Sequence, residues 1–285
     1  MYSFSFVNNY KCMKRERILV TVKTYPTLSK SHIELVCTAG FREDGSWIRI
    51  YPIPFRLLEQ DSQFSKWTWI ELPIRRRAKD KRPESYSPTD RNDIIIGERI
   101  SSAHDWEARR ALTFAGSKIW SDLQALIEAG KRNELSLATF KPAKMINYEW
   151  EAAKTKWNEE KLAVIEAQLR QKDLLESDSI RENFQPADQI PFNFYYRFED
   201  ENGHSSRLRI LDWEIGMLYR NCLSRNGGDV DAALESVRLR YETEFFEKDL
   251  HLFLGTTLEW HDRAPNPWVI IGVVPFPMKH QLDLF

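Results

Sequence analysis

The sequence predicts an α+β protein with a β-rich N-terminal barrel or curled sheet, a helical middle, and a C-terminal α+β part with closing strands. Three observations lead to this class. Short apolar segments alternate with period two in the first hundred residues, the period changes to 3.6 from about Ser101, and strand-like segments return in the last hundred residues. The chain has 285 residues, of which 42% are hydrophobic, so it can bury one large core or two modest ones.

Five strands are expected in the N-terminal part. "REDG" connects the second and third of them as a hairpin, with Gly45 at the turn. In "SWIRIYP", Trp47, Arg49 and Tyr51 alternate with two isoleucines, which predicts one apolar face and one face of polar-tipped side chains. The expected strands cover residues 17–26, 32–41, 46–55, 67–75 and 93–100.

Helical periodicity dominates the middle of the chain. Residues 102–114 and 118–133 are expected to be helices, the second with Gly130 as its C-terminal stop. Residues 135–150 are compatible with a return to a sheet. A longer amphipathic helix is expected over residues 151–176, where mixed charges indicate a solvated face beside an apolar stripe.

The C-terminal part follows a polar, proline-bearing boundary at residues 176–191. A hairpin is expected to turn at Asn202 and Gly203, and Asp212 is expected to be the N-cap of the next helix. A second helix and two closing strands follow. The chain therefore divides into a β-rich domain (14–100), a helical region (101–180), a C-terminal α+β region (181–274) and a tail (275–285).

The composition bears on nucleic-acid binding and on the cellular location of the protein. The net charge is −1, so any binding to nucleic acid must come from local clusters of basic residues. Cys12, Cys37 and Cys222 show no disulfide or zinc spacing, which favours a reduced, cytoplasmic location. No apolar run is long enough to span a membrane, and no secretory signal opens the chain, although Met13 could replace Met1 as the start.

The most specific motif is "QLDLF" at residues 281–285. It resembles the short linear motif by which bacterial DNA polymerases, mismatch-repair proteins and other replication factors bind the β sliding clamp. Gln281 stands at the glutamine position of the motif, Leu284 and Phe285 form its apolar pair, and Leu282 and Asp283 fit the positions between them. The resemblance covers five residues and implies a partner, the bacterial β sliding clamp, but no fold.

Physical chemistry accounts for such a motif. Adjacent leucine and aromatic side chains of an extended peptide can insert into preformed apolar pockets, and each is worth roughly 1.5–3 kcal/mol when fully buried. The proline residues Pro275 and Pro277 stiffen the segment before it. The alternative is that Leu282, Leu284 and Phe285 close this protein's own core.

A basic segment suggests a contact with DNA. Between Arg75 and Arg91 the chain carries seven basic and three acidic residues, and arginines in a loop between strands can reach phosphates. Trp67, Trp69 and Tyr86 lie near enough in sequence to stack on bases. The alternative is a solvated loop. The candidate DNA-binding residues are Arg75, Arg76, Arg77, Lys79, Lys81 and Arg82.

The outline of the N-terminal part is similar to PUA-like barrels, which often read modified or flipped bases. This resemblance rests on the order of strands and helices and not on a motif. It implies a binding face formed by Trp47, Arg49 and Tyr51, while their ordinary role would be the outer face of a sheet.

Catalytic signals are weak. The chain lacks the glycine-rich phosphate loops, the G-x-S-x-G elbow and the H-E-x-x-H metal motif. His204, Asp212 and Glu214 are the candidates for a catalytic site, although no metal-ligand spacing relates them. No cofactor is expected unless the protein is a nuclease, which would need magnesium or manganese.

Two functions follow from these observations. The first is a DNA-associated protein that docks on the β sliding clamp and acts in replication, repair or defence against foreign DNA. The second is a clamp-targeted, metal-dependent nuclease. A third class, an enzyme of small molecules or RNA modification with a structural tail, has no specific support in the sequence.

Overall fold

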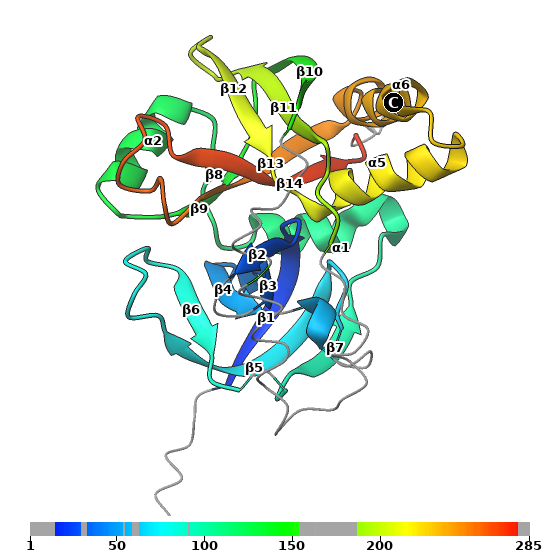
Figure 1. The fold of residues 1–285 in the computed structure, drawn as a ribbon. Coiled ribbons are helices and arrows are strands. Elements are labelled where there is room, and N and C mark those ends of the chain that lie inside the picture. Colours follow the sequence, from blue (N-terminus) through cyan, green and yellow to red (C-terminus); the bar gives the residue numbers. More distant parts are fainter. Residues whose placement is uncertain are drawn as a thin grey trace, which may run out of the picture.

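The structure is a computed structural model that describes residues 15–29, 33–53, 55–58, 63–90, 92–153, 163 and 187–278. Most of the helix expected over 151–176 and the whole motif at 281–285 lie outside the described residues. Within them the protein is α+β, with a closed barrel in the N-terminal half and a second sheet with helices in the C-terminal half (Figure 1). This confirms the predicted fold class.

The first sheet closes into a five-stranded barrel because its first strand pairs with both β3 and β5. The order around the barrel is β1-β3-β4-β6-β5, and β7 and β2 pair outside it with β5 and β3. The strands are β1 (Arg15–Lys23), β2 (Thr27–Ser29), β3 (Ile33–Arg42), β4 (Trp47–Ile53), β5 (Thr68–Arg76), β6 (Ser85–Pro88) and β7 (Ile95–Arg99), with the short 3-10 helix η1 (Phe55–Leu57) after β4.

The second sheet has the order β10-β11-β12-β14-β13-β9-β8. Most pairs are antiparallel, but β12 runs parallel to β14 and β8 parallel to β9. The strands are β8 (Ile119–Trp120), β9 (Leu137–Phe140), β10 (Lys144–Ala152), β11 (Phe192–Glu199), β12 (Ser205–Ile210), β13 (Asp249–Thr256) and β14 (Trp268–Phe276). The helices are α1 (Ala103–Phe114), α2 (Leu123–Lys131), α5 (Trp213–Arg225) and α6 (Val230–Arg238), and α6 continues into a π-helical segment, η3 (Leu239–Glu244).

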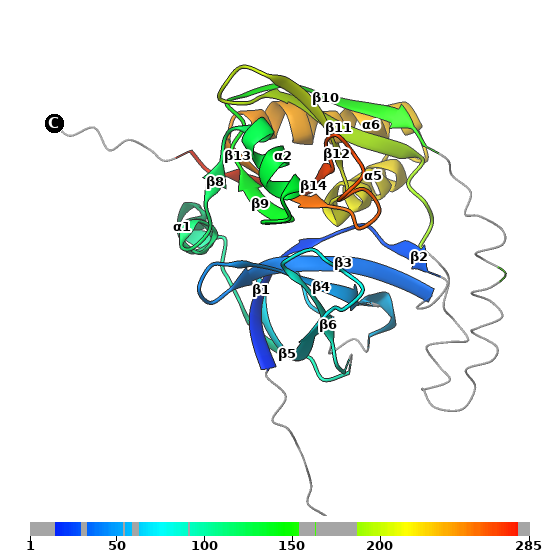
Figure 2. The same cartoon turned by 90° about the vertical axis from the view of Figure 1, so that its left-hand side faces the viewer.

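Alternation along the strands produces one core inside the barrel and one on each face of the second sheet. On β1, Ile18 and Val20 point into the barrel, whereas Leu19 and Val22 pack against the second sheet. The other face of that sheet packs against α2, α5 and α6, where Leu252 contributes to the core. Figure 2 shows the barrel below and the second sheet above, with β9 and β14 nearest the barrel.

Several local predictions are confirmed. The hairpin between β3 and β4 turns at Gly45, whose φ of +77° suits glycine, and the β11–β12 hairpin turns at Gly203 with the same φ. Asp212 is the N-cap of α5, and its side chain accepts a hydrogen bond from the Glu214 amide. The middle of the chain holds strands as well as helices, because β8, β9 and β10 join the second sheet.

No helix among the described residues is both long enough and apolar enough to cross a membrane.

Candidate functional site

Of the basic side chains at the end of β5 and in the loop before β6, some are exposed and others form hydrogen bonds within the protein. Arg75, Lys79 and Lys81 are exposed. Arg76, at the end of β5, donates hydrogen bonds to the carbonyl oxygens of Pro83 in the loop and Ser85 at the start of β6. Only part of the predicted DNA-binding set is therefore free to meet a phosphate from solvent.

Arg82 lies inside the protein, only 5% exposed. Its guanidinium donates two hydrogen bonds to Asp80, from Nε to Oδ1 at 2.9 Å and from Nη2 to Oδ2 at 2.7 Å. It also donates to the carbonyl oxygen of Thr256 on β13. Burial by itself raises the pKa of the Asp80 carboxyl, but the hydrogen bonds and charge of Arg82 lower it to about 2. The loop is thus anchored to the second sheet.

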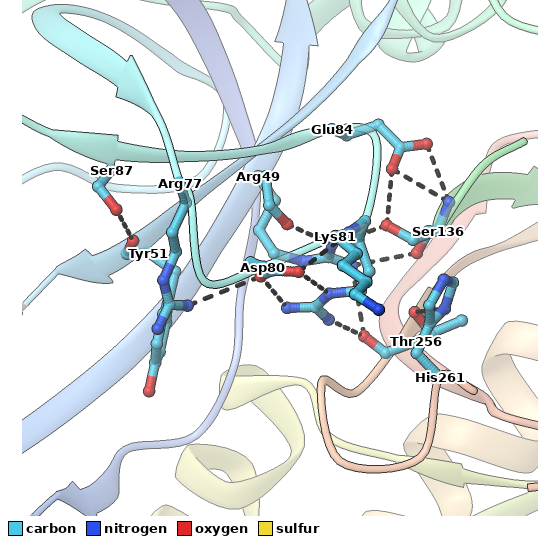
Figure 3. Close-up of polar contacts among 12 residues, drawn as sticks. Arg49, Tyr51, Arg77, Asp80, Lys81, Glu84, Ser87, Ser136, Thr256 and His261 are labelled. Carbon is cyan, nitrogen blue, oxygen red and sulfur yellow. Dashed lines mark hydrogen bonds and ion pairs between the residues drawn. The ribbon is translucent and has the colours of Figure 1, made fainter. Parts of the chain in front are cut away.

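Arg49 on β4 reinforces this anchor. It is 2% exposed, and its guanidinium donates to Ser85 Oγ at 3.1 Å, Ser136 Oγ at 2.8 Å and the Ser136 carbonyl oxygen at 3.0 Å (Figure 3). None of the described carboxylates forms an ion pair with Arg49. Burial, and then the charge of Arg82, lower its pKa to about 10.

The polar-tipped face of β4 is therefore not an outer face. Trp47 is 7% exposed and packs in the core between barrel and second sheet, where its ring meets Phe253 edge-on with centroids 5.0 Å apart. Tyr51 is half-buried, and the Arg77 guanidinium lies 4.6 Å from the centroid of its ring. In Figure 3 the two side chains project side by side from the barrel.

A central cavity of about 660 Å³ lies between the barrel and the second sheet. Its volume is in the range of small-molecule sites. The barrel contributes Cys37, Arg49, Tyr51, Arg77 and Arg82 to its lining. The second sheet and its connections contribute Gln189, Phe192, Phe194, Arg209 and Thr257.

A second hollow, which we call the basic groove, has a volume of about 470 Å³. Six cationic side chains line it against two carboxylates, Glu214 and Glu244. Three tryptophans, Trp67, Trp106 and Trp213, provide flat faces beside the charges. The cations are Lys23, Lys66, Arg99, Arg109, Arg240 and Lys248.

The geometry of the basic groove is specific. Arg109 is 7% exposed, and its guanidinium lies 5.1 Å from the ring centroid of Trp67 and 4.9 Å from that of Trp106. Both tryptophans have positive φ, 64° and 62°. A positive φ costs a residue other than glycine of order 1–3 kcal/mol of conformational free energy. Residues in this conformation are concentrated at functional sites.

Lys23 is a partly buried cation of the groove. Its ammonium donates to the Phe64 carbonyl oxygen at 2.9 Å and lies 4.1 Å from the centroid of the Phe55 ring. Burial, and then the charge of Lys66, lower the pKa of Lys23 to about 8.

Of the predicted catalytic residues, Asp212 and Glu214 lie together beside Lys66, whereas His204 lies apart from them. His204 is exposed in the β11–β12 turn, where its amide donates to Asp200, while Asp212 and Glu214 lie beyond the far end of β12. The Asp212 carboxylate is buried and accepts from Lys66 Nζ at 2.7 Å and 2.8 Å. Lys66 also pairs with Glu214 Oε2 at 3.2 Å.

These contacts give Asp212 a structural role as helix cap and ion-pair partner. In the part of the chain that the structure describes, no group of three or more His, Cys, Asp or Glu side chains is placed to hold a metal ion.

The candidate clamp-binding residues Gln281, Leu282, Asp283, Leu284 and Phe285 lie outside the described residues. The segment that leads to them is described as far as Met278, which is 57% exposed. Pro275 and Pro277 line the basic groove, and the Pro277 carbonyl oxygen accepts a hydrogen bond from Arg110 Nη2 at 2.8 Å.

The sequence interpretation missed the basic groove because its residues come from six separate segments of the chain. One signal was present: "SKWTW" and "HDWEARR" both interleave basic residues with tryptophan, and both supply groove residues. Charge counting within one loop could not detect a set that folding assembles from distant segments.

Two family models match the chain and divide it between the barrel half and the second-sheet half. Residues 14–115 match the Domain of unknown function (DUF8758), and residues 118–285 match the Domain of unknown function (DUF8757). A comparison with curated proteins gives no match.

Proposed function

The chain belongs to the family Domain of unknown function (DUF8757), and we propose that it is a DNA-associated protein recruited to the bacterial β sliding clamp by residues 281–285. The observation that carries this proposal is the position of the segment before the motif. Pro275 and Pro277 form part of the wall of the basic groove, so a clamp-binding motif follows directly on a surface with the charge and aromatic faces that nucleic acid requires.

The basic groove suits a phosphate backbone. Its six cations exceed its two carboxylates by four charges, and Arg99, Arg240 and Lys248 are exposed. Of these three, Arg99 and Lys248 form no ion pair with a described residue, while Arg240 pairs with Glu244. Guanidinium and ammonium groups without internal partners are available to phosphates.

Attachment to the clamp strengthens a weak DNA contact. Four residue steps separate Pro277 from Gln281, and such a segment spans at most about 14 Å. A clamp held by the motif would lie close to the groove, and the high effective concentration would raise the affinity for the DNA that the clamp encircles. Three exposed residues, Arg75 near the end of β5 and Lys79 and Lys81 in the loop after it, add a second candidate contact with DNA.

The proposed setting is the bacterial cytoplasm, in replication, repair or defence against foreign DNA. Clamp recruitment supports all three processes equally, because each acts on DNA where a clamp is loaded.

The test compares clamp binding by the intact protein and by a Leu284→Ala, Phe285→Ala double variant, using surface-immobilised sliding clamp. A matched control, Leu239→Ala with Trp260→Ala, removes a leucine and an aromatic ring that are 50% and 51% exposed elsewhere. We expect the intact protein and the control to bind, and the motif variant to lose at least tenfold in affinity. Equal binding by all three proteins, or binding by none, would contradict the proposal.

A further inference from the structure

The central cavity holds polar atoms that the described residues leave unsatisfied. Gln189 Oε1 and Thr257 Oγ1 are buried without a hydrogen-bond partner in the described part of the chain. Arg77 Nη1 also forms no hydrogen bond there and has only an ion pair of 3.6 Å with Asp80 Oδ2; all three residues line the cavity. Buried polar atoms are normally paired, so an unpaired set around one cavity indicates a ligand that supplies the missing partners.

The cavity also carries an excess of positive charge. Four arginines line it, Arg49, Arg77, Arg82 and Arg209, against one carboxylate, Asp212, which Lys66 already neutralises. Asp80 forms a close ion pair with Arg82, at 2.7 Å. The ion pair between Asp80 and Arg77 is longer, at 3.6 Å. Arg209 forms no hydrogen bond or ion pair with a described residue, so Arg77 and Arg209 are the guanidiniums available to an anion.

Flat and apolar side chains form the remaining walls. Phe192 and Phe194 come from β11, and Tyr51 and Tyr25 come from the barrel side. The Tyr25 hydroxyl is fixed by a hydrogen bond to the Asp188 carbonyl oxygen at 3.0 Å and by one from Arg220 Nε at 2.9 Å. A rigid aromatic wall of this kind is suited to stacking against a planar ring.

These three features narrow the chemistry of the ligand. A bare phosphate would fill little of a cavity of about 660 Å³ and would not use the aromatic side chains that line it. An apolar molecule would leave the arginines and the three polar atoms without hydrogen bonds. A planar ring with a hydrogen-bonding edge and an attached anion satisfies all of them. We infer that the central cavity binds a single nucleotide, with the base between the aromatic side chains and the phosphate on Arg77 and Arg209.

In this arrangement the amide of Gln189 and the hydroxyl of Thr257 meet the edge of the base. Both groups accept as well as donate hydrogen bonds, so they can distinguish one base edge from another. The site does not depend on the clamp motif, and it stands whether or not the tail binds a clamp.

Two sources present the same chemistry, a free nucleotide and a nucleotide within a DNA strand. One arm of the experiment titrates the protein with the eight common nucleoside monophosphates by calorimetry, with inorganic phosphate and ribose 5-phosphate alongside. The other arm uses a duplex with 2-aminopurine opposite an abasic site, whose fluorescence rises when the base leaves the stack.

The variants are Arg209→Ala and Arg77→Ala, and the control is Arg225→Ala, an exposed arginine in the last turn of α5 that lines neither the cavity nor the basic groove. Thermal unfolding of each variant verifies its fold. We expect at least one nucleotide, free or within the duplex, to bind at least tenfold more tightly than either phosphate compound. We also expect both cavity variants to weaken that binding at least tenfold and the control to leave it unchanged.

Three outcomes would overturn the inference. They are no binding in either arm, equal binding of inorganic phosphate and nucleotides, and nucleotide binding that is insensitive to both cavity variants. Loss of clamp binding in the motif variant would have no bearing on any of them, so the failures of the two proposals remain distinguishable.

Discussion

Arg49 on β4 donates a hydrogen bond from Nη1 to Ser136 Oγ, 2.8 Å away across the boundary between the barrel and the second sheet. Ser136 in turn donates to Glu84 through its hydroxyl, and its amide donates to the same carboxylate at 2.9 Å. Arg49 and Glu84, both from the barrel half, thus hydrogen-bond to the same residue of the second-sheet half, Ser136. These hydrogen bonds hold the barrel against the second sheet beside the central cavity, which Arg49 lines.

The first prediction concerns Arg49 itself. Arg49→Lys keeps a buried charge but loses the fork of donors, so we expect the free energy of unfolding to fall by roughly 1.5–3 kcal/mol. Arg49→Met should cost less, because the charge is gone and the Ser136 carbonyl still accepts from the Thr256 amide at 3.0 Å. Urea denaturation measures both, and a larger loss for methionine than for lysine would contradict this account.

The second prediction separates a structural from a catalytic Asp212. Asp212→Asn retains a capping side chain but leaves Lys66 as a buried charge beside only the exposed Glu214, so we expect a loss of about 3–5 kcal/mol in unfolding free energy. Glu214→Gln, at a side chain that is 58% exposed, should cost at most about 1 kcal/mol. Chemical denaturation checks both, and an Asn variant as stable as the parent would show that the ion pair is not needed.

The third prediction is a pH dependence that originates at Lys23. Its pKa is about 8 in the folded protein against an ordinary value of 10.5, so the unfolded chain binds more protons between these pH values. The free energy of unfolding should therefore rise as pH increases from about 8 to 10.5. The affinity of the basic groove for DNA should fall over the range where Lys23 loses its charge.

Fluorescence anisotropy with a labelled duplex at pH 7 and pH 9 measures the change in affinity. Lys23→Met serves as the comparison, since it lacks the titrating group and should show a smaller change over the same interval. An identical pH response of the two proteins would assign the effect to another group.

The fourth prediction uses the salt dependence of DNA binding. Arg99→Ala with Lys248→Ala removes two exposed cations of the basic groove, so the slope of log K against log salt should decrease by about 1.8 for a duplex. Lys131→Ala with Arg132→Ala, at the exposed end of α2, removes the same charge outside both hollows. That control should keep the slope of the parent, and a similar decrease in both variants would locate the DNA contact elsewhere.

Local signals in the sequence were sufficient for most of the longer elements, but not for the short strands β2, β6 and β8. Gly45 between two alternating segments indicated the β3–β4 hairpin, and Asp212 before an amphipathic run indicated the start of α5. Both follow from conformational preferences within a few residues. The same reasoning placed the basic loop but not the role of its members, because nothing near Arg82 in sequence shows that Thr256 will meet it.

The sequence by itself indicated most of the longer strands and helices, the turns of two hairpins, and the resemblance of residues 281–285 to a clamp-binding motif. The tertiary structure alone decided which charges remain available. It buried Arg49 and Arg82 between the two halves, paired Asp212 with Lys66, and gathered six distant cations beside three tryptophans. The physical reason is that strand and helix preferences act over a few residues, whereas the solvation and partners of a charged group depend on everything that packs around it.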